Sequence, residues 1–221
     1  LPERKMKIHK NIVQGTEEWE RIRYGKIGGT RSKFLLKPTD TIIYELLAEH
    51  TEPYAPDYDS YESADMIRGH ELEPHARKSL EDLTGIEFLE AGWIEGENSF
   101  IGISPDGYSE CGKFMCELKC LGAKKHNEIV MTDGIHEDYI FQCVHYFTVN
   151  PDLETLFFAA YRPEHLYKPL VMRKLERYSE VNVGTKSKPI IVTVQTATGW
   201  ALDEALNLKA KLDTIINEMK F

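Results

Sequence analysis

Residues 104–120 read SPDGYSECGKFMCELKC, an Asp-Gly corner followed by a short apolar run that carries two opposite charges. Glu117 and Lys119 are two residues apart, so on a strand both side chains leave the same face while Leu118 packs on the other. The intervening ECGK predicts a hairpin loop, and in an antiparallel hairpin Asp106 approaches the same face from the neighbouring strand. We therefore expect the three charged side chains to gather at one point of a sheet.

Two carboxylates at such a point repel each other, and each resists ionisation unless a cation lies between them. Hard oxygen ligands of this kind suit magnesium or manganese rather than zinc. A lysine beside them can orient or deprotonate a water, or hold a phosphate. The alternative is a surface hairpin with a solvated ion pair worth tenths of a kcal/mol, which is the usual meaning of an isolated Glu-x-Lys triplet. The Asp-Gly corner, Glu73 upstream and Gln142 on a later predicted helix weigh against that alternative.

The chain has 221 residues and a mass of 25.5 kDa, which predicts a single domain over residues 1–221. It has no run of eighteen apolar residues and no signal-peptide pattern, so we expect a cytoplasmic protein without a membrane partner. Met6 could be a natural start, which would make residues 1–5 an added segment. The net charge of -9 alone argues against a nucleic-acid partner. That argument fails if the carboxylates hold metal ions.

The four cysteines allow two interpretations. Cys111, Cys116 and Cys120 follow the spacing C-x4-C-x3-C, and Cys143 stands alone. A zinc or iron–sulfur site would need a fourth ligand at a usual spacing, and none is present. We therefore expect buried, reduced thiols.

Helices are predicted in the first third and the last half of the chain. Their approximate bounds are 16–25, 39–49, 69–85, 137–149 and 200–219. The third is placed from Gly69 because Pro74 is tolerated only in a first helical turn. This puts Glu73 in that first turn, where any carboxylate is favourable to the helix dipole.

The middle of the chain is rich in β-formers. Residues 86–95, 99–107 and 113–120 predict an antiparallel meander, and residues 155–163, 168–177 and 189–194 predict further strands. Strands with helices before and after them indicate an α/β or α+β layered domain.

SPDG followed by ELKC resembles the pattern of the PD-(D/E)xK nucleases, and the chain is most similar to the lambda exonuclease (YqaJ-type) branch of phage recombination exonucleases. Other similar fragments are GTEEWERIRYGKIGGTRS, RGHELEPHARKSLEDLTG, DYIFQCVHYF and FFAAYRP, which together cover nearly the whole chain. Each fragment is weak alone, but their order and spacing are specific. The resemblance implies a restriction-endonuclease-like core, with a central mixed or antiparallel sheet flanked by helices.

The resemblance also implies a set of site residues. Asp106 and Glu117 would bind metal with the Leu118 carbonyl, and Glu73 would complete the site directly or through water. Lys119 would position the attacking water, with Gln142 beside it. The implied cofactor is a pair of Mg²⁺ ions bridged by Asp106, with Mn²⁺ as a substitute.

A second group of residues is implied for the DNA end. Arg23 matches the arginine that binds the terminal 5′-phosphate in this family, with Thr30 as a nearby hydroxyl donor. Taken alone, Arg23 fits a solvated helix residue better than a binding residue. Gln142 and His145, on one helix face, have the alternative of core hydrogen-bonding residues. His145 has no motif support and is left outside the site. Two glycines in GKIGGTRS depart from the family pattern and make this pocket less certain than the metal site.

The implied function is a metal-dependent 5′-to-3′ exonuclease that acts on 5′-phosphorylated ends of double-stranded DNA. It would release 5′-mononucleotides and leave 3′ overhangs for recombination with a single-strand annealing protein. Family members are ring-shaped homotrimers of phage or prophage origin that act in the bacterial cytoplasm. The residues 178–199 exceed the corresponding family tail and are expected to alter subunit contacts.

Two alternatives stay open. A site-specific or structure-specific DNA endonuclease of the same fold would need a base-reading element, and none is identified. A catalytically silent DNA-end-binding module would have lost a carboxylate or the lysine, whereas Asp106, Glu117 and Lys119 are all present.

Overall fold

The computed structural model describes residues 6–55 and 63–220. Its centre is a four-stranded sheet made of β4 (Gly107–Tyr108), β5 (Phe114–Cys120), β6 (Thr155–Tyr161) and β7 (Leu170–Glu176), in that order. β5 pairs antiparallel with β4 and parallel with β6, and β6 pairs antiparallel with β7. The sheet is therefore mixed, as expected.

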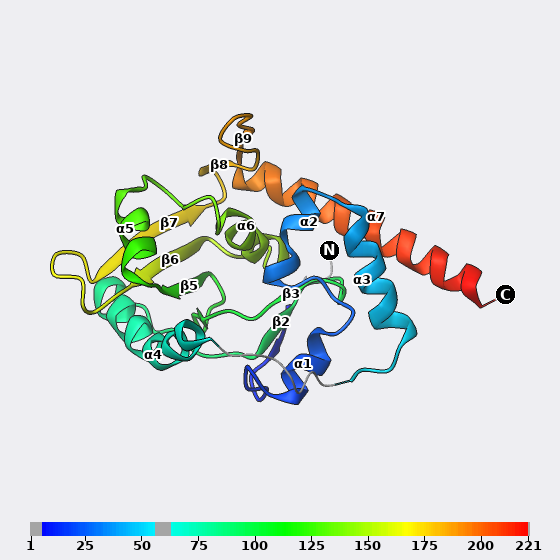
Figure 1. Ribbon diagram of the computed structural model, residues 1–221, viewed down its shortest axis with the longest axis horizontal. Coiled ribbons are helices and arrows are strands. Elements are labelled where there is room, and N and C mark those ends of the chain that lie inside the picture. Colours follow the sequence, from blue (N-terminus) through cyan, green and yellow to red (C-terminus); the bar gives the residue numbers. More distant parts are fainter. Residues whose placement is uncertain (1–5, 56–62, 221) are drawn as a thin grey trace.

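Helices cover both faces of this sheet (Figure 1). On one face lies α4 (Ala64–Thr84), and the alternating residues Leu118, Phe157 and Ala159 of the sheet pack against its apolar side. On the other face lies α6 (Ile140–Val149), which is itself packed against the long closing helix α7 (Val194–Met219). This layering separates the residues that alternate along β5 into two cores.

A smaller antiparallel sheet contains β1 (Lys7–His9), β2 (Trp93–Glu95) and β3 (Gly102–Ile103). The prediction of one continuous meander over residues 86–120 was therefore wrong. The chain leaves the small sheet after β3 and enters the central sheet at β4. Pro105 lies in the crossing, and a proline cannot donate to a strand ladder.

The two helices predicted over residues 16–25 and 39–49 are confirmed. The Thr16 side chain accepts the Trp19 amide hydrogen at the start of α1 (Glu17–Arg23). Gly25, with φ +72°, follows the helix end. The second helix, α3 (Asp40–Thr51), buries the expected Ile and Leu face against the core.

The predicted helix start near Gly69 was wrong. One helix, α4, runs unbroken from a cap at Ser63, whose side chain accepts the Met66 amide hydrogen, to Gly85 with φ +71°. Pro74 is tolerated inside it because its ring lies on the exposed side of the helix. Glu73 is therefore in the middle of α4. Residues 57–62, which also have a helical pattern, lie outside the described residues.

The end of the chain also differs from its prediction. Thr193 caps α7 by accepting the Thr196 amide hydrogen, so the helix begins at Val194 instead of near Trp200. Gly199 lies inside this helix. The predicted strand over 189–194 shortens to β9 (Ile191–Thr193), which pairs with β8 (Glu180–Asn182).

Several short elements were not predicted. They are η1 (Gly29–Arg31), α2 (Lys33–Leu36) and α5 (Ala123–Met131), together with β1 and β8. Most of them are too short to show a helical or strand period. None of the helices in the described part of the chain has the length and apolar character needed to span a bilayer.

The hairpin loop between β4 and β5 is confirmed. The Ser109 amide donates to the Phe114 carbonyl, and Gly112 adopts φ +73° at the turn. At the other end of β4, Gly107 lies so close to its neighbours that a Cβ atom would be 2.8 Å from Cys116 Sγ and 2.8 Å from Phe88 Cβ. The glycine of the SPDG segment is thus required by close packing.

Two alanine substitutions at glycine test this description. Gly107→Ala should lower the free energy of unfolding by about 1–3 kcal/mol because the new methyl group overlaps buried atoms. Gly69→Ala should raise it by about 0.5–1 kcal/mol, because Gly69 is inside a continuous helix with open space around it. Urea unfolding measures both. A destabilising Gly69→Ala would contradict an unbroken α4.

Candidate active site

The carboxylate of Asp106 is held at the edge of β5. The Leu118 amide donates to Asp106 Oδ2 at 2.6 Å, and Arg77 Nε donates to the Asp106 backbone carbonyl at 2.8 Å. The first bond comes from the strand and the second from α4. Asp106 is therefore fixed between the sheet and the helix that covers it.

The two residues before Asp106 are fixed as well. Ser104 Oγ accepts a hydrogen bond from the Trp19 indole at 2.8 Å, and the Pro105 carbonyl accepts one from the Gln14 amide at 3.1 Å. The chain crossing between the two sheets is thus held by side chains from two segments, residues 14–19 and α4. Such support reduces the freedom of the loop that carries Asp106.

Glu117 is the most buried acidic side chain of the site, with 1% of its surface exposed. One carboxylate oxygen forms an ion pair with Lys119, and the other lies 2.7 Å from the Tyr146 hydroxyl. Burial and the charge of Glu117 raise the pKa of Tyr146 well above its usual range, so the hydroxyl stays protonated and donates to Glu117. Both oxygens of Glu117 are therefore satisfied.

The protonation of Lys119 follows from its neighbours. Burial alone would lower its pKa, but the negative charges of Glu117 and Asp106, with the hydrogen bond to Glu117, raise the pKa above its ordinary value. These charges favour the ammonium form of Lys119, which can donate hydrogen bonds.

For Asp106, in contrast, the neighbours oppose the charged form. Burial, followed by the charge of Glu117, raises its pKa well above the ordinary value, and Lys119 offsets this only in part. The charge of Glu73 adds to the effect. The site therefore contains more negative charge than its own cations neutralise, which is the condition that a bound metal ion would relieve.

Glu73 lies beside this cluster without completing it. Its carboxylate accepts a hydrogen bond from Arg77 at 2.8 Å, one helical turn further along α4. Burial raises the pKa of Glu73, although Arg77 acts in the other direction. Arg77 thus connects Glu73 to the Asp106 backbone, which it also contacts.

The donors present fit a hard divalent cation. On a strand the amide and carbonyl of one residue point to the same side, so the Leu118 carbonyl faces the edge where its amide meets Asp106. Asp106, Glu117 and this carbonyl are oxygen donors of the kind that magnesium and manganese prefer. Within residues 6–55 and 63–220, no three acidic, histidine or cysteine side chains already converge on one point. Glu73 is held by Arg77, and its predicted part in the site stays a prediction.

Gln142 occupies the space between this cluster and η1. It precedes Tyr146 by one turn of α6, and its side chain packs within 3.4 Å of the position that a Cβ of Gly29 would take. Tyr139, on the same side of the helix, has its ring 5.7 Å from Lys119 Nζ. Among the described residues Gln142 makes no hydrogen bond to Lys119, so its predicted place beside the lysine stays a prediction.

His145 lies outside the site, as its lack of motif support indicated. It is buried, and its Nε2 is 2.9 Å from the Gly102 carbonyl. Burial lowers its pKa to about 4, so the ring is neutral at physiological pH. It is a core hydrogen-bonding residue that joins α6 to β3.

The cysteines are only partly as expected. All four are free, and Cys116 and Cys143 are buried, but Cys111 is exposed in the hairpin loop. A turn must face solvent, so the expectation of a buried thiol was wrong for Cys111. Cys120 is half-buried, and burial raises the pKa of its thiol to about 11.

The residues implied for the DNA end lie together in a separate pocket. Arg23 and Thr30 both line a cavity of about 190 Å³, with Arg31 and Glu49 on its wall. The Arg23 guanidinium lies 3.7 Å from the centre of the Trp19 ring. It has no carboxylate partner among the described residues. Arg31, in contrast, forms two hydrogen bonds with Glu49, at 2.8 and 2.5 Å.

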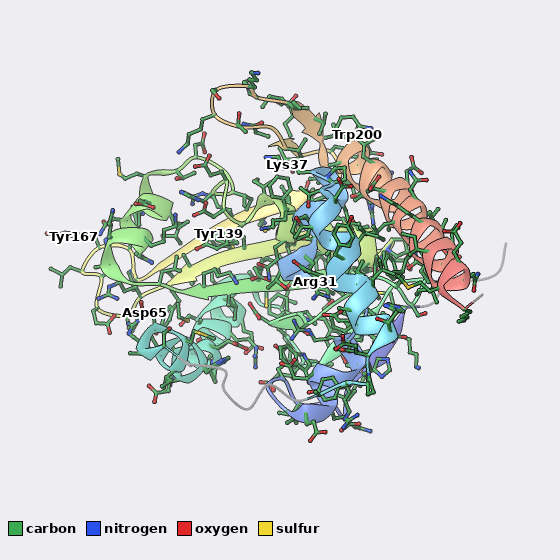
Figure 2. All side chains as sticks on the ribbon, turned by 45° about the vertical axis from the view of Figure 1, so that its right-hand side comes forward. Arg31, Lys37, Asp65, Tyr139, Tyr167 and Trp200 are labelled. Atoms are coloured by element: carbon green, nitrogen blue, oxygen red, sulfur yellow. The ribbon has the colours of Figure 1, made fainter. Side chains whose placement is uncertain are left out.

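One side chain connects this pocket to the metal site. The face of the Trp19 ring lies under Arg23, and its indole N–H donates to Ser104, two residues before Asp106. Figure 2 labels Arg31 and Tyr139, which mark the pocket side and the Lys119 side of this region.

Sequence reasoning missed four residues that position the site: Gln14, Trp19, Arg77 and Tyr146. Two of them were detectable in principle by helical spacing. Arg77 follows Glu73 by four residues, and Tyr146 follows Gln142 by four, so each shares a helix face with a predicted site residue. Gln14 and Trp19 act across the chain, and only the folded structure shows their contacts.

Comparison with known proteins shows the relatives of this chain. The sequence model of the YqaJ-like viral recombinase domain matches residues 18–152. Two crystal structures of LHK-Exo, an alkaline exonuclease from Laribacter hongkongensis, are 22% identical and cover 93% of this chain and 98% of theirs. Their TM-scores are 0.70, for the complex with dAMP, and 0.69. The predicted layered nuclease fold is thereby confirmed.

A phage-related exonuclease from Haemophilus somnus 129PT is 14% identical, with a TM-score of 0.46 over 95% of this chain and 92% of its own. No protein with curated annotation matches the chain.

The raised pKa of Asp106 predicts how stability depends on pH. In the unfolded chain Asp106 ionises near pH 4, whereas in the metal-free fold it holds its proton to higher pH, so the wild type loses stability as pH rises between the two pKa values. Asp106→Asn has no such loss. In EDTA, urea unfolding should therefore show the variant gaining stability over the wild type from about pH 4 upward. A wild type that is more stable than the variant at pH 8 would show that the bond from Leu118 outweighs the burial of charge.

Proposed function

Because the chain belongs to the YqaJ-like viral recombinase family, we propose that it is a metal-dependent 5′-to-3′ exonuclease. It would digest one strand of linear double-stranded DNA to 5′-mononucleotides and leave 3′ single-stranded overhangs. The observation that supports this most is the meeting of Asp106, Glu117 and Lys119 at the edge of β5, with a separate cationic pocket linked to them through Trp19. The charged cluster would cleave a phosphodiester, and the pocket would distinguish a DNA end from an internal phosphate.

Asp106, Glu117 and the Leu118 carbonyl are the residues that would hold two magnesium ions, with manganese as a substitute. The ions, when bound, would supply positive charge opposite the phosphate oxygens and lower the pKa of a coordinated water. Lys119 is held as an ammonium, so its part is to orient the attacking water or a phosphate oxygen by donating hydrogen bonds. Tyr146 keeps Glu117 in place, and Glu73 reaches the site through water.

The pocket lined by Arg23 and Thr30, which we call the end pocket, would account for the proposed 5′-to-3′ direction of digestion. A terminal 5′-phosphate carries roughly two charges, whereas an internal diester carries one. Arg23 offers a permanently charged planar donor that forms no ion pair among the described residues, although Glu20 and Glu49 also line the pocket, and Thr30 adds a hydroxyl. An alkaline exonuclease of the same fold has been crystallised with dAMP, a nucleotide of the size that we propose as product.

The same proposal includes partners and place of action. We propose a homotrimeric ring that acts with a single-strand annealing protein in the cytoplasm of a bacterial host, from a phage or prophage gene. A ring would let an acidic chain surround DNA with few cations from each subunit. Sedimentation at micromolar concentration would contradict the ring if it gave 25.5 kDa rather than three times that mass.

A DNA endonuclease of the same fold, site-specific or structure-specific, is the second candidate. It differs from the exonuclease in acting on DNA without ends. Incubation of end-labelled linear duplex and closed circular duplex, each with magnesium or with EDTA, separates the two. Loss of the linear substrate alone, only with magnesium, is the expected result, and cleavage of the circle would favour the endonuclease.

The first prediction concerns the metal-binding carboxylates. Asp106→Ala should abolish cleavage in magnesium but leave binding to DNA ends intact or stronger, because a negative charge is removed. Lys119→Ala should also abolish turnover, and it should lower the melting temperature as well, because the buried Glu117 carboxylate loses its cation. Cleavage is therefore compared at a temperature at which circular dichroism shows the variant folded. Lys113→Ala is the matched control, since Lys113 is an exposed lysine at the start of the same strand, paired with Glu154. Cleavage above a few per cent in Asp106→Ala would refute the assignment.

The second prediction concerns the 5′-phosphate. Duplex with 5′-phosphates should be degraded faster than the same duplex with 5′-hydroxyls, and Arg23→Ala should remove about 1.5–3 kcal/mol of that preference with its charged hydrogen bonds. Arg21→Ala is the control, because Arg21 lies on the same helix but is exposed and paired with Glu17. A full preference in Arg23→Ala would remove Arg23 as the anchor. Degradation from the 3′ end would overturn the direction.

A further inference from the structure

Two stretches of this acidic chain contain no acidic residue at all. Residues 21–39 carry six basic residues and no Asp or Glu, and residues 181–202 carry Lys186 and Lys188 and no Asp or Glu. The whole chain has 36 acidic residues in 221, or about one in six, so stretches of this length would ordinarily contain three. The distribution therefore marks two segments whose positive charge is not compensated within the segment itself.

The fold brings these two segments together. Lys37 Nζ, at the end of α2, donates to the Gly184 carbonyl at 2.9 Å, although the two residues are 147 positions apart. Helix α2 also packs against α7, which follows β9. Figure 2 shows Lys37 between Arg31 and the β8–β9 hairpin. The acid-free segments are thus neighbours on one side of the molecule.

The hairpin loop between β8 and β9 has a fixed shape. The Thr185 amide donates to the Lys188 carbonyl at 3.0 Å, and the Asn182 side chain accepts the amides of Gly184 and Ile190 at 3.0 and 2.9 Å. The side chains from Thr185 to Lys188 are all exposed. The loop therefore presents two lysines and two hydroxyls, Thr185 and Ser187, on a preformed turn.

The lysines of this region are largely free of carboxylate partners. Lys33, Lys37 and Lys188 have none among the described residues. Lys186 pairs with Glu137 at 2.7 Å, but the two side chains are 82% and 48% exposed, so water and salt screen the pair. We call Lys33, Lys37, Lys186 and Lys188 the basic stripe.

The basic stripe continues from the site already described. Arg31, two residues before Lys33, lines the end pocket with Arg23. Lys37 lies 4.7 Å from the centre of the Phe141 ring, and the next residue, Gln142, packs against Gly29 of η1, which adjoins the end pocket. The stripe and the end pocket are therefore joined through the segment from Gly28 to Lys37.

We propose that the basic stripe binds the sugar–phosphate backbone of the double-stranded DNA whose 5′ end occupies the Arg23 pocket. This inference rests on the proposed function, because it assumes that DNA is the substrate. Lysines and small hydroxyls on a rigid loop are the groups that contact phosphates without reading bases. An acidic peptide could also bind the lysines, but a peptide ligand would not explain why the stripe is continuous with the end pocket. The unassigned hairpin at residues 180–193 thereby gains a role in holding substrate.

The test is the salt dependence of DNA binding by Lys186→Ala/Lys188→Ala. The probe is a labelled duplex of about 30 base pairs with one 5′-phosphorylated end and one hairpin-closed end, titrated in EDTA between about 50 and 200 mM salt. Each lost phosphate contact should reduce the slope of log K against log salt by about 0.9, so the double variant should lose about 1.8 and bind tenfold or more weakly. Lys78→Ala/Lys113→Ala is the control, with the same charge change on residues paired elsewhere.

The control should keep the wild-type slope. The stripe variant should lose the same affinity for 5′-phosphate and 5′-hydroxyl duplexes, whereas Arg23→Ala should lose affinity mainly for the 5′-phosphate duplex. Circular dichroism should show both double variants folded. If the stripe variant kept the wild-type slope, or if the control lost as much slope as the stripe variant, the DNA-binding role of the stripe would be overturned. The exonuclease proposal would be unaffected. Weaker binding of polyglutamate with unchanged duplex binding would assign the stripe to an acidic protein and overturn it too. A wild type that binds no DNA would overturn both proposals.

Discussion

The hydrogen bond from the Leu118 amide to the Asp106 carboxylate is the interaction on which the site depends. It uses a backbone donor that β4 leaves unpaired, because β4 begins at Gly107, opposite Cys116, and does not reach Leu118. The bond brings Asp106 next to Glu117 and turns the Leu118 carbonyl to the same edge. A short strand is thus a requirement of the chemistry, since a longer β4 would pair with the groups that form the site. Close packing at Gly107 makes this arrangement possible.

The second constraint is electrostatic. The site collects carboxylates in a buried place, where burial and the charge of Glu117 raise the pKa of Asp106, and the protein offsets them with donors from different layers. Lys119 comes from the strand itself, Tyr146 from the helix on one face and Arg77 from the helix on the other. These groups hold the carboxylates without neutralising them fully. The remaining negative charge destabilises the metal-free fold and favours a cation, a balance that is common at functional sites.

Local patterns predicted the parts of the molecule that depend on local physics. The two-residue period placed Glu117 and Lys119 on one face, the cap at Thr16 located α1, and the family resemblance identified from ordered fragments is confirmed. Predictions failed where tertiary structure overrides a local rule: α4 continues through Pro74, and α7 begins at a cap that Gly199 obscured. Helical spacing places Arg77 and Tyr146 on the same helix faces as predicted site residues, but the groups that they contact depend on which helix covers which face of the sheet, and only the fold shows that.

The shared use of Trp19 has a thermodynamic consequence. Its ring supports Arg23 at the end pocket, and its N–H holds Ser104 beside Asp106, so two binding sites share one side chain. If a ligand at one site orders this indole, a ligand at the other site no longer has to order it and therefore binds more tightly. The coupling free energy is the same in both directions, because linkage between two binding equilibria is reciprocal. A terminal phosphate and a metal ion would then be cooperative ligands. The enzyme would be assembled most completely on the substrate that it can process, and least completely on DNA that presents no end.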